Sequence, residues 1–190
     1  MSYSKNALIG IIMGSSSDSK TMKGAAEILD TFNIKHEDQI ISAHRTPNRI
    51  EEYAKYAEKK GFKVIIAGAG GAAHLPGMIA SNTLIPVIGV PIMVYNDKRD
   101  GKNDLRFSSF GGLDSLLSIS EMPSGSPVVS VGVNKSINAG IYAAKILANE
   151  FPELKKKISE YKHTQYNSVV KESIEMKKLG LSKFVLKKFK

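Results

Sequence analysis

The fold follows most directly from Ala7-Leu-Ile-Gly-Ile-Ile-Met13 and from Gly14-Ser-Ser-Ser-Asp18, which comes directly after it. A continuous apolar run of this length is typical of a strand that is buried on both faces of a parallel sheet. The glycine and the serines end the strand. The apolar residues beyond them recur at helical spacing as far as Phe32. The stretch therefore predicts a strand, a short polar loop and a helix that packs back on the sheet.

The same succession of strand and helix repeats along the chain. Further strands are predicted over residues 36–41, 63–67, 86–90 and 127–133, and further helices over 48–60, 75–83, 112–120, 134–150 and from Pro152 onward. Gly61 is a typical C-cap residue for the second helix. Five alternations of strand and helix imply an α/β fold of three layers, a doubly wound parallel five-stranded sheet with right-handed crossovers and a C-terminal helical extension.

Ligands of such sheets bind outside the carboxyl ends of the strands. Three polar loops are expected there, namely Gly14–Asp18, Ser42–Pro47 and Gly68–Gly77. All three can face one crevice. This convergence is a stronger indication of a site than any single motif.

The second loop, Ser42-Ala-His-Arg-Thr-Pro47, carries the most chemistry. His44 supplies an imidazole, whose unperturbed pKa is about 6.5, and Arg45 supplies a planar fork suited to phosphate or carboxylate. Thr46 followed by proline predicts an N-cap and the first helical residue. On its own the loop is more typical of a solvated polar turn than of a site.

The other two loops have both binding and structural interpretations. Small hydroxyls beside a helix start can hold a phosphate, and Asp18 suits sugar hydroxyls; alternatively, Ser17 or Asp18 only caps the helix. The small residues 68–73 resemble a dinucleotide fingerprint, but they follow the third strand and no acidic residue stands about 20 positions later. They suggest instead close approach to a flat ligand or to another subunit. His74 ends this loop.

Composition excludes several classes of protein. The chain has no cysteine, no H-x-H or H-E-x-x-H metal pattern and no G-x-S-x-G elbow, so neither a metal site nor a hydrolase nucleophile is expected. No apolar run approaches the roughly 20 residues of a membrane span, and residues 7–13 are too short for a signal peptide core. The absence of cysteine is compatible with a reducing compartment without proving one, and no membrane contact is expected.

The formal charge of +9 is uneven, with +7 in residues 151–190 and +2 in residues 1–150. We expect a single α/β catalytic domain over 1–150 and a basic helical extension over 151–190, packed on the same domain or on a neighbouring subunit. A basic tail also admits a nucleic-acid-binding module, but no aromatic platform accompanies it. The solvated amphipathic helix is favoured, and no nucleic-acid partner is expected.

The loops together resemble class I N5-carboxyaminoimidazole ribonucleotide mutase, of the phosphoribosylaminoimidazole carboxylase catalytic subunit family. The matching blocks are 13–18, 42–47, 67–78, 86–91, 112–119 and Met122-Pro123. The related class that carboxylates aminoimidazole ribonucleotide directly typically has lysine after the histidine and a different third loop. Arg45 and Ala69-Gly-Gly therefore favour the mutase, and the direct carboxylase remains the alternative.

The resemblance implies a flavodoxin-like fold, a cytoplasmic homo-octamer with sites between subunits, and a purine-biosynthesis enzyme that moves a carboxylate from nitrogen to ring carbon C4 of a small ribonucleotide without any cofactor. It implies His44 as general acid/base and a phosphate site at Ser15, Ser17, Ser42 and Arg45. It further implies that Asp18 holds the ribose and that Ala69, Gly70, Gly71, Ala72 and His74 line the base pocket. The charged loop Tyr95–Phe110 and the tail past Lys178 depart from the family pattern.

Overall fold

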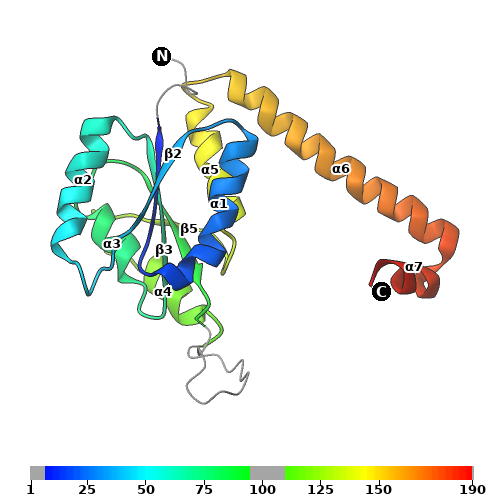
Figure 1. Ribbon diagram of the computed structural model, residues 1–190, viewed down its shortest axis with the longest axis horizontal. Coiled ribbons are helices and arrows are strands. Elements are labelled where there is room, and N and C mark those ends of the chain that lie inside the picture. The colour runs from blue at the N-terminus through cyan, green and yellow to red at the C-terminus, as the bar shows by residue number, and fades with distance from the viewer. Residues whose placement is uncertain (1–6, 95–109, 190) are drawn as a thin grey trace.

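The computed structural model describes residues 7–94 and 110–189. Its centre is a five-stranded, all-parallel sheet in the order β2-β1-β3-β4-β5 (Figure 1). The strands are β1 Ile9–Met13, β2 His36–Ile40, β3 Val64–Gly70, β4 Val87–Ile92 and β5 Val129–Ser130. The helices are α1 Ser19–Thr31, α2 Asn48–Lys60, α3 His74–Ala80, α4 Leu113–Ser120, α5 Ser136–Leu147, α6 Glu153–Leu179 and α7 Leu181–Lys188, with a short 3-10 turn η1 at Ser16–Asp18.

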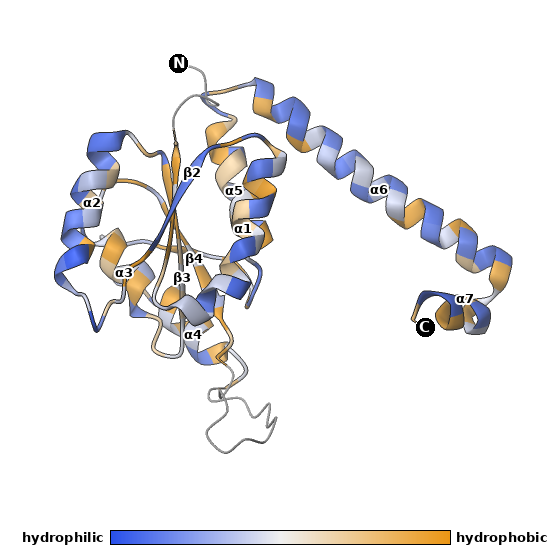
Figure 2. Cartoon of the chain, viewed as in Figure 1, coloured by the Kyte–Doolittle hydropathy of each residue, from blue (hydrophilic) through white to orange (hydrophobic). Residues whose placement is uncertain are grey.

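Helices cover both faces of the sheet, as the alternation of apolar runs predicts. One core layer packs α1 and α5 against the sheet, and the other packs α2, α3 and α4 against the opposite face. β1, β3 and β4 are apolar along their whole length and occupy the middle of the molecule (Figure 2). The prediction of a three-layer, doubly wound α/β fold is confirmed.

Several boundaries differ from the sequence-based expectation. β3 continues to Gly70, so the first three residues of the predicted third loop are strand, and α3 already begins at His74. β5 contains only two residues, because ladder pairing to β4 is limited to Val129 and Ser130. Gly61 ends α2 in the left-handed conformation with φ 77°, as predicted. Most of the predicted Tyr95–Phe110 loop lies outside the described residues.

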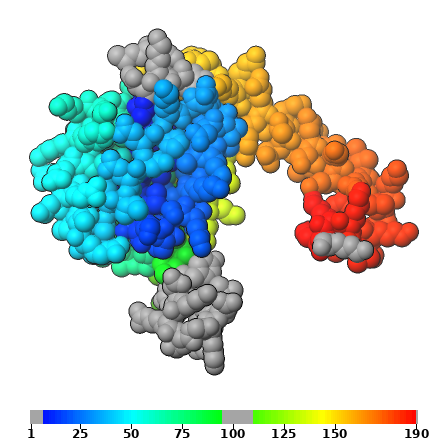
Figure 3. Space-filling model, viewed as in Figure 1, coloured from blue at the N-terminus to red at the C-terminus, as the bar shows by residue number. Residues whose placement is uncertain are grey.

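Among the described residues, the C-terminal extension meets the domain at its beginning. Leu154 and Ile158 are buried, the Tyr161 ring packs edge-on to Phe32 at 5.7 Å, and Lys157 donates a hydrogen bond to the Phe32 carbonyl. Beyond these turns α6 runs away from the sheet, and α7 folds back along its far end (Figures 1 and 3). The extension is therefore helical, as predicted, but it is broken at Gly180, where φ is 74°.

Candidate active site

A pocket of about 430 Å³ lies at the carboxyl ends of β1, β2 and β3. Because β1 stands between β2 and β3 in the sheet, the loops that follow these three strands are neighbours. The pocket is lined by Gly14, Ser15, Ser17, Asp18, Ser42, Ala43, His44, Arg45, Ala69, Gly70, Ala72, His74, Leu75 and Val94. The three loops that the sequence singles out thus meet at one site.

The first loop is ordered by its own hydroxyls. Ser15 caps the 3-10 turn η1, with its Oγ accepting from the Ser17 backbone N–H at 3.3 Å and from the Ser17 hydroxyl at 3.0 Å. Asp18 occupies the N-cap position of α1, as one alternative predicted, but its side chain makes no capping hydrogen bond. Both serines face the pocket.

Asp18 is the buried carboxylate of the site, with 8% of the residue exposed. Burial raises its pKa above the ordinary value, and hydrogen bonds from the Ser15 backbone and the Ser17 hydroxyl together with the nearby Arg45 charge oppose that rise. These donors hold a charged acceptor in place without filling all of its lone-pair positions. Asp18 is therefore poised to accept hydrogen bonds from a ligand.

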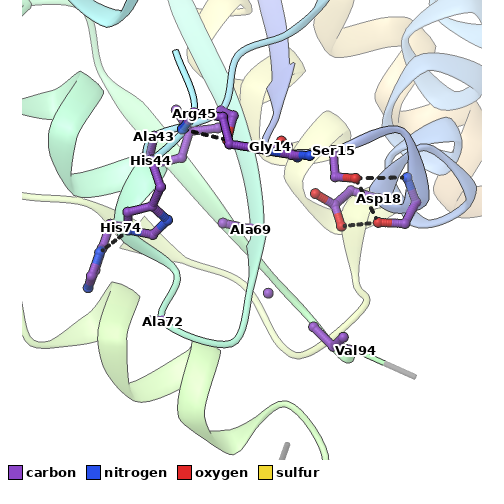
Figure 4. A pocket seen from close by; sticks show the side chains of 14 residues that line it. Gly14, Ser15, Asp18, Ala43, His44, Arg45, Ala69, Ala72, His74 and Val94 are labelled. Carbon is purple, nitrogen blue, oxygen red and sulfur yellow. Dashed lines mark hydrogen bonds between the residues drawn. The ribbon is translucent and has the colours of Figure 1, made fainter. Parts of the chain in front are cut away.

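The second loop is tied both to itself and to the first loop. The Ser42 hydroxyl accepts hydrogen bonds from the Arg45 backbone N–H at 3.3 Å and from Arg45 Nε at 3.2 Å. Arg45 Nη2 donates to the Gly14 carbonyl at 3.2 Å. The guanidinium is thereby held at the edge of the pocket, beside the loop that carries the serines (Figure 4).

Thr46 does not cap α2, contrary to the prediction. Its hydroxyl accepts from the Ser42 backbone N–H and donates to the Ser42 carbonyl, both at 3.0 Å, and α2 begins two residues later at Asn48. The threonine side chain thus closes the loop on itself instead of starting the helix. This closed turn fixes the position from which His44 and Arg45 project.

Two histidines meet across the site although 30 residues separate them in the sequence. His44 Nε2 and His74 Nδ1 lie 2.8 Å apart, and the ring planes are inclined at 74°. Only one proton fits between two nitrogens at this distance, so one ring donates and the other accepts. Figure 4 shows this pair at one end of the pocket and Ser15 with Asp18 at the other, with Ala69 between them.

The third loop supplies the small residues at the pocket floor. Ala69, Gly70 and Ala72 line the pocket, whereas Gly71 does not. Gly71 has φ 63° and turns the chain out of β3, so a Cβ built there would point into open space. A Cβ on Gly70 would lie 2.4 Å from Cγ2 of Val94, which leaves no room for a larger residue.

The structure thus gathers ten of the eleven predicted site residues and leaves only Gly71 outside the lining. Gly14, Ala43 and Leu75 also line the pocket and belong to the three loops, although they were not predicted as site residues; Val94 lines it from outside all three loops. Val94 lies two residues after the end of β4, and the rule that ligands bind at the carboxyl ends of strands is the signal that could have found it. Within residues 7–94 and 110–189 no group of three or more His, Cys, Asp or Glu lies close enough to hold a metal ion.

These features define a flavodoxin-like α/β protein with a polar small-molecule pocket at the topological switch point of its sheet. The chain belongs to the AIR carboxylase family, whose model matches residues 8–168.

Relatives with known names are similar along nearly the whole chain. The N5-carboxyaminoimidazole ribonucleotide mutase of Thermotoga maritima is 49% identical over 180 residues, covering 95% of this chain and 98% of the relative. The mutase of Bacillus subtilis is 46% identical over 171 residues, covering 89% and 98%. The crystal structure of Treponema denticola PurE superposes with a TM-score of 0.73 at 27% identity, covering 93% of this chain and all 100% of that one.

Proposed function

We propose that this protein is an N5-carboxyaminoimidazole ribonucleotide mutase of purine biosynthesis. The observation that carries the proposal is the pocket itself, with hydroxyls, Asp18 and Arg45 at one end and the His44–His74 pair at the other. Relatives named as this mutase are similar over almost the full length of the chain. We propose further, from the resemblance to this family, that the enzyme works in the cytoplasm as a homo-octamer with sites between subunits.

The two ends of the pocket suit the two ends of a ribonucleotide. Ser15, Ser17 and Arg45 offer hydroxyl and guanidinium donors to a phosphate, while Asp18 offers a carboxylate to ribose hydroxyls. The Ser42 oxygen accepts from the backbone N–H and Nε of Arg45 and so helps to hold that side chain, while its own O–H can still donate to the phosphate. The imidazole base then lies over the small residues 69, 70 and 72, next to the histidines.

The reaction needs a group that gives a proton and later takes one back. In the proposed sequence the N–CO2 bond breaks, carbon dioxide leaves and His44 protonates the exocyclic nitrogen. Carbon C4 then attacks the retained carbon dioxide, and His44 removes the C4 proton to restore the ring. The proton returns to its donor, so the transfer is balanced without an added reagent.

His74 positions the proposed acid/base. Its Nδ1 engages Nε2 of His44, which leaves Nδ1 of His44 for the substrate and sets the tautomer of both rings. A floor of small residues around the base excludes water and keeps carbon dioxide near C4. The carbon dioxide then does not have to be captured again from solution.

A paired assay tests the proposal. One reaction contains N5-carboxyaminoimidazole ribonucleotide, the other contains aminoimidazole ribonucleotide with high bicarbonate, and the C4-carboxylated product is followed by its ultraviolet absorbance. We expect fast product in the first reaction alone and a loss of at least about a hundredfold in kcat for His44→Asn. His163→Asn, on the exposed part of α6, is the matched control and keeps full activity. Product mainly from bicarbonate would establish the direct carboxylase instead, and an active His44→Asn would remove the acid/base role.

A further inference from the structure

Hydrogen bonds close the loop that carries His44 at two points. At the inner point, the Thr46 hydroxyl accepts from the Ser42 N–H and donates to the Ser42 carbonyl, both at 3.0 Å, and the Thr46 N–H donates to the same carbonyl at 2.9 Å. At the outer point, Nη1 of Arg49 on α2 donates to the carbonyl of Ile40, the last residue of β2, at 3.0 Å. Thr46 and Arg49 do not line the pocket, so their hydrogen bonds shape the loop without touching a ligand.

Packing alone does not fix the shape of this loop. Ile41 and Ala43 before the histidine and Ile50 after it are buried in the core layer that contains α2. Between these anchors, residues 44–49 are exposed apart from the half-buried Thr46. Hydrogen bonds between loop side chains and the backbone therefore set the conformation of the part that projects toward the pocket.

The position of His44 depends on the loop backbone more than the position of Arg45 does. His44 is exposed, and within the described residues its ring makes one hydrogen bond, to His74. The Arg45 side chain is held at two points, by the Ser42 hydroxyl and by the Gly14 carbonyl of the first loop. A loosened loop should therefore misplace the imidazole while the guanidinium keeps its contact with the first loop.

We propose that Thr46 is a positioning residue for the proton transfers of the reaction, an inference that rests on the proposed function. Its hydroxyl fixes the Ser42 backbone so that His44 meets His74 beside the reacting ring, and Arg49 supports the same loop as a second, weaker tie. Thr46 and Ser42 then have different functions in one loop, because the Ser42 hydroxyl holds Arg45 for the phosphate. A catalytic group that is misplaced by about 1 Å can lose on the order of a hundredfold in rate, so a smaller displacement is measurable.

Steady-state kinetics of Thr46→Val in the mutase assay tests this role, because valine keeps the shape of the side chain but neither donates nor accepts. We expect kcat to fall about tenfold while KM stays within about twofold, since Arg45 keeps its bond to Gly14. Thr46→Ser restores the hydroxyl and should bring kcat back to within about twofold of the wild type. The matched control is Thr31→Val at the end of α1, where the hydroxyl likewise donates to the carbonyl four residues earlier, at 2.9 Å, and this variant should keep full activity.

Three outcomes overturn the proposal. They are an unchanged kcat in Thr46→Val, a loss of kcat that Thr46→Ser or Thr31→Val shares, and a rise in KM as large as the fall in kcat. If Thr46→Val does not fold, Arg49→Met decides, because it removes the outer tie from an exposed side chain. Its kcat should fall about threefold with KM unchanged, and an unchanged kcat counts against the proposal. A wild-type protein without mutase activity refutes the proposed function and this role together, whereas an active wild type with an equally active Thr46→Val refutes this role alone.

Discussion

Removing one buried oxygen atom should make this protein more stable. Tyr53 lies on α2 with 4% of the residue exposed, and its hydroxyl has no hydrogen-bond partner among the described residues. Burial raises the pKa of the phenol well above its ordinary value, and the nearby Glu37 charge raises it further, so the group stays neutral. The hydroxyl lies over Gly10 of β1, where a Cβ would be only 2.0 Å away.

The size of the effect follows from desolvation. A buried donor without a partner costs about 1–3 kcal/mol, and loss of the oxygen's packing contacts offsets part of the gain from removing it. Tyr53→Phe should therefore stabilise the fold by about 1 kcal/mol, or raise the unfolding midpoint by about 2–4 °C for a chain of this size. Thermal and urea unfolding at one fixed protein concentration measure this, because assembly shifts apparent stability.

The same substitution one turn further along α2 is the control. The Tyr56 hydroxyl donates to Glu37 Oε2 at 2.5 Å, and Tyr56→Phe should destabilise the protein by about 1–2 kcal/mol because that carboxylate loses its donor. A Tyr53→Phe midpoint that falls as far as that of Tyr56→Phe would refute the reasoning and indicate a bound water at the hydroxyl. Gly10→Ala should be destabilising, and less so in the Tyr53→Phe background, since its new methyl group meets that hydroxyl.

Three further predictions concern the site and the edge of the sheet. Ser42→Ala frees the Arg45 side chain and should raise KM about tenfold with kcat nearly unchanged, as steady-state kinetics would measure. Asp18→Asn removes a charged acceptor for the ligand, so KM should rise at least about tenfold. Because burial penalises that charge in the folded state, the unfolding midpoint should not fall. The pKa of His36 is raised in the folded state mainly by its hydrogen bond to Asp38. The protonated imidazole therefore stabilises the folded protein fully below its ordinary pKa of 6.5, and this stabilisation is lost as the pH rises through the higher folded-state pKa. Unfolding midpoints should therefore decline from about pH 6 upward, and less steeply in His36→Gln.

Each of these predictions has an outcome that contradicts it. Ser16→Ala, in the first loop but outside the pocket lining, should leave KM unchanged; an equal rise would make the Ser42 effect unspecific. Asp18→Asn with an unaltered KM would remove the aspartate from ligand binding. A pH profile of stability that is identical in wild type and His36→Gln would assign the decline to other groups.

The architecture could be predicted from the sequence because its central strands appear there as continuous apolar runs. β1, β3 and β4 are buried on both faces, so their apolar runs are continuous and their ends are marked by glycine or proline. The three loops could be predicted to share one crevice, since all strands of a parallel sheet present their carboxyl ends on the same side. Ten of eleven predicted site residues line the pocket for this reason.

The remaining features depend on contacts that no local pattern encodes. Gly71 belongs to the motif but does not line the pocket, and its φ of 63° lies in the left-handed region directly after β3. Thr46 is a residue type that often caps helices, yet its side chain forms hydrogen bonds with the Ser42 backbone within the loop and does not cap α2. The length of α6 was indicated by its periodicity, whereas its departure from the domain after Tyr161 was not.

The two ends of the pocket have a topological origin. The chain leaves β1 toward one face of the sheet, to form α1, and leaves β2 and β3 toward the other face, to form α2 and α3. The second and third loops therefore converge on one side, where α2 and α3 are in contact and where His44 reaches His74. The first loop stays on the α1 side with Ser15 and Asp18, and the Arg45–Gly14 hydrogen bond spans the two sides. The reversal of direction between α1 and α2 therefore places the serines and Asp18 on one side of the crevice and the histidine pair on the other, and Arg45 of the second loop bridges the two.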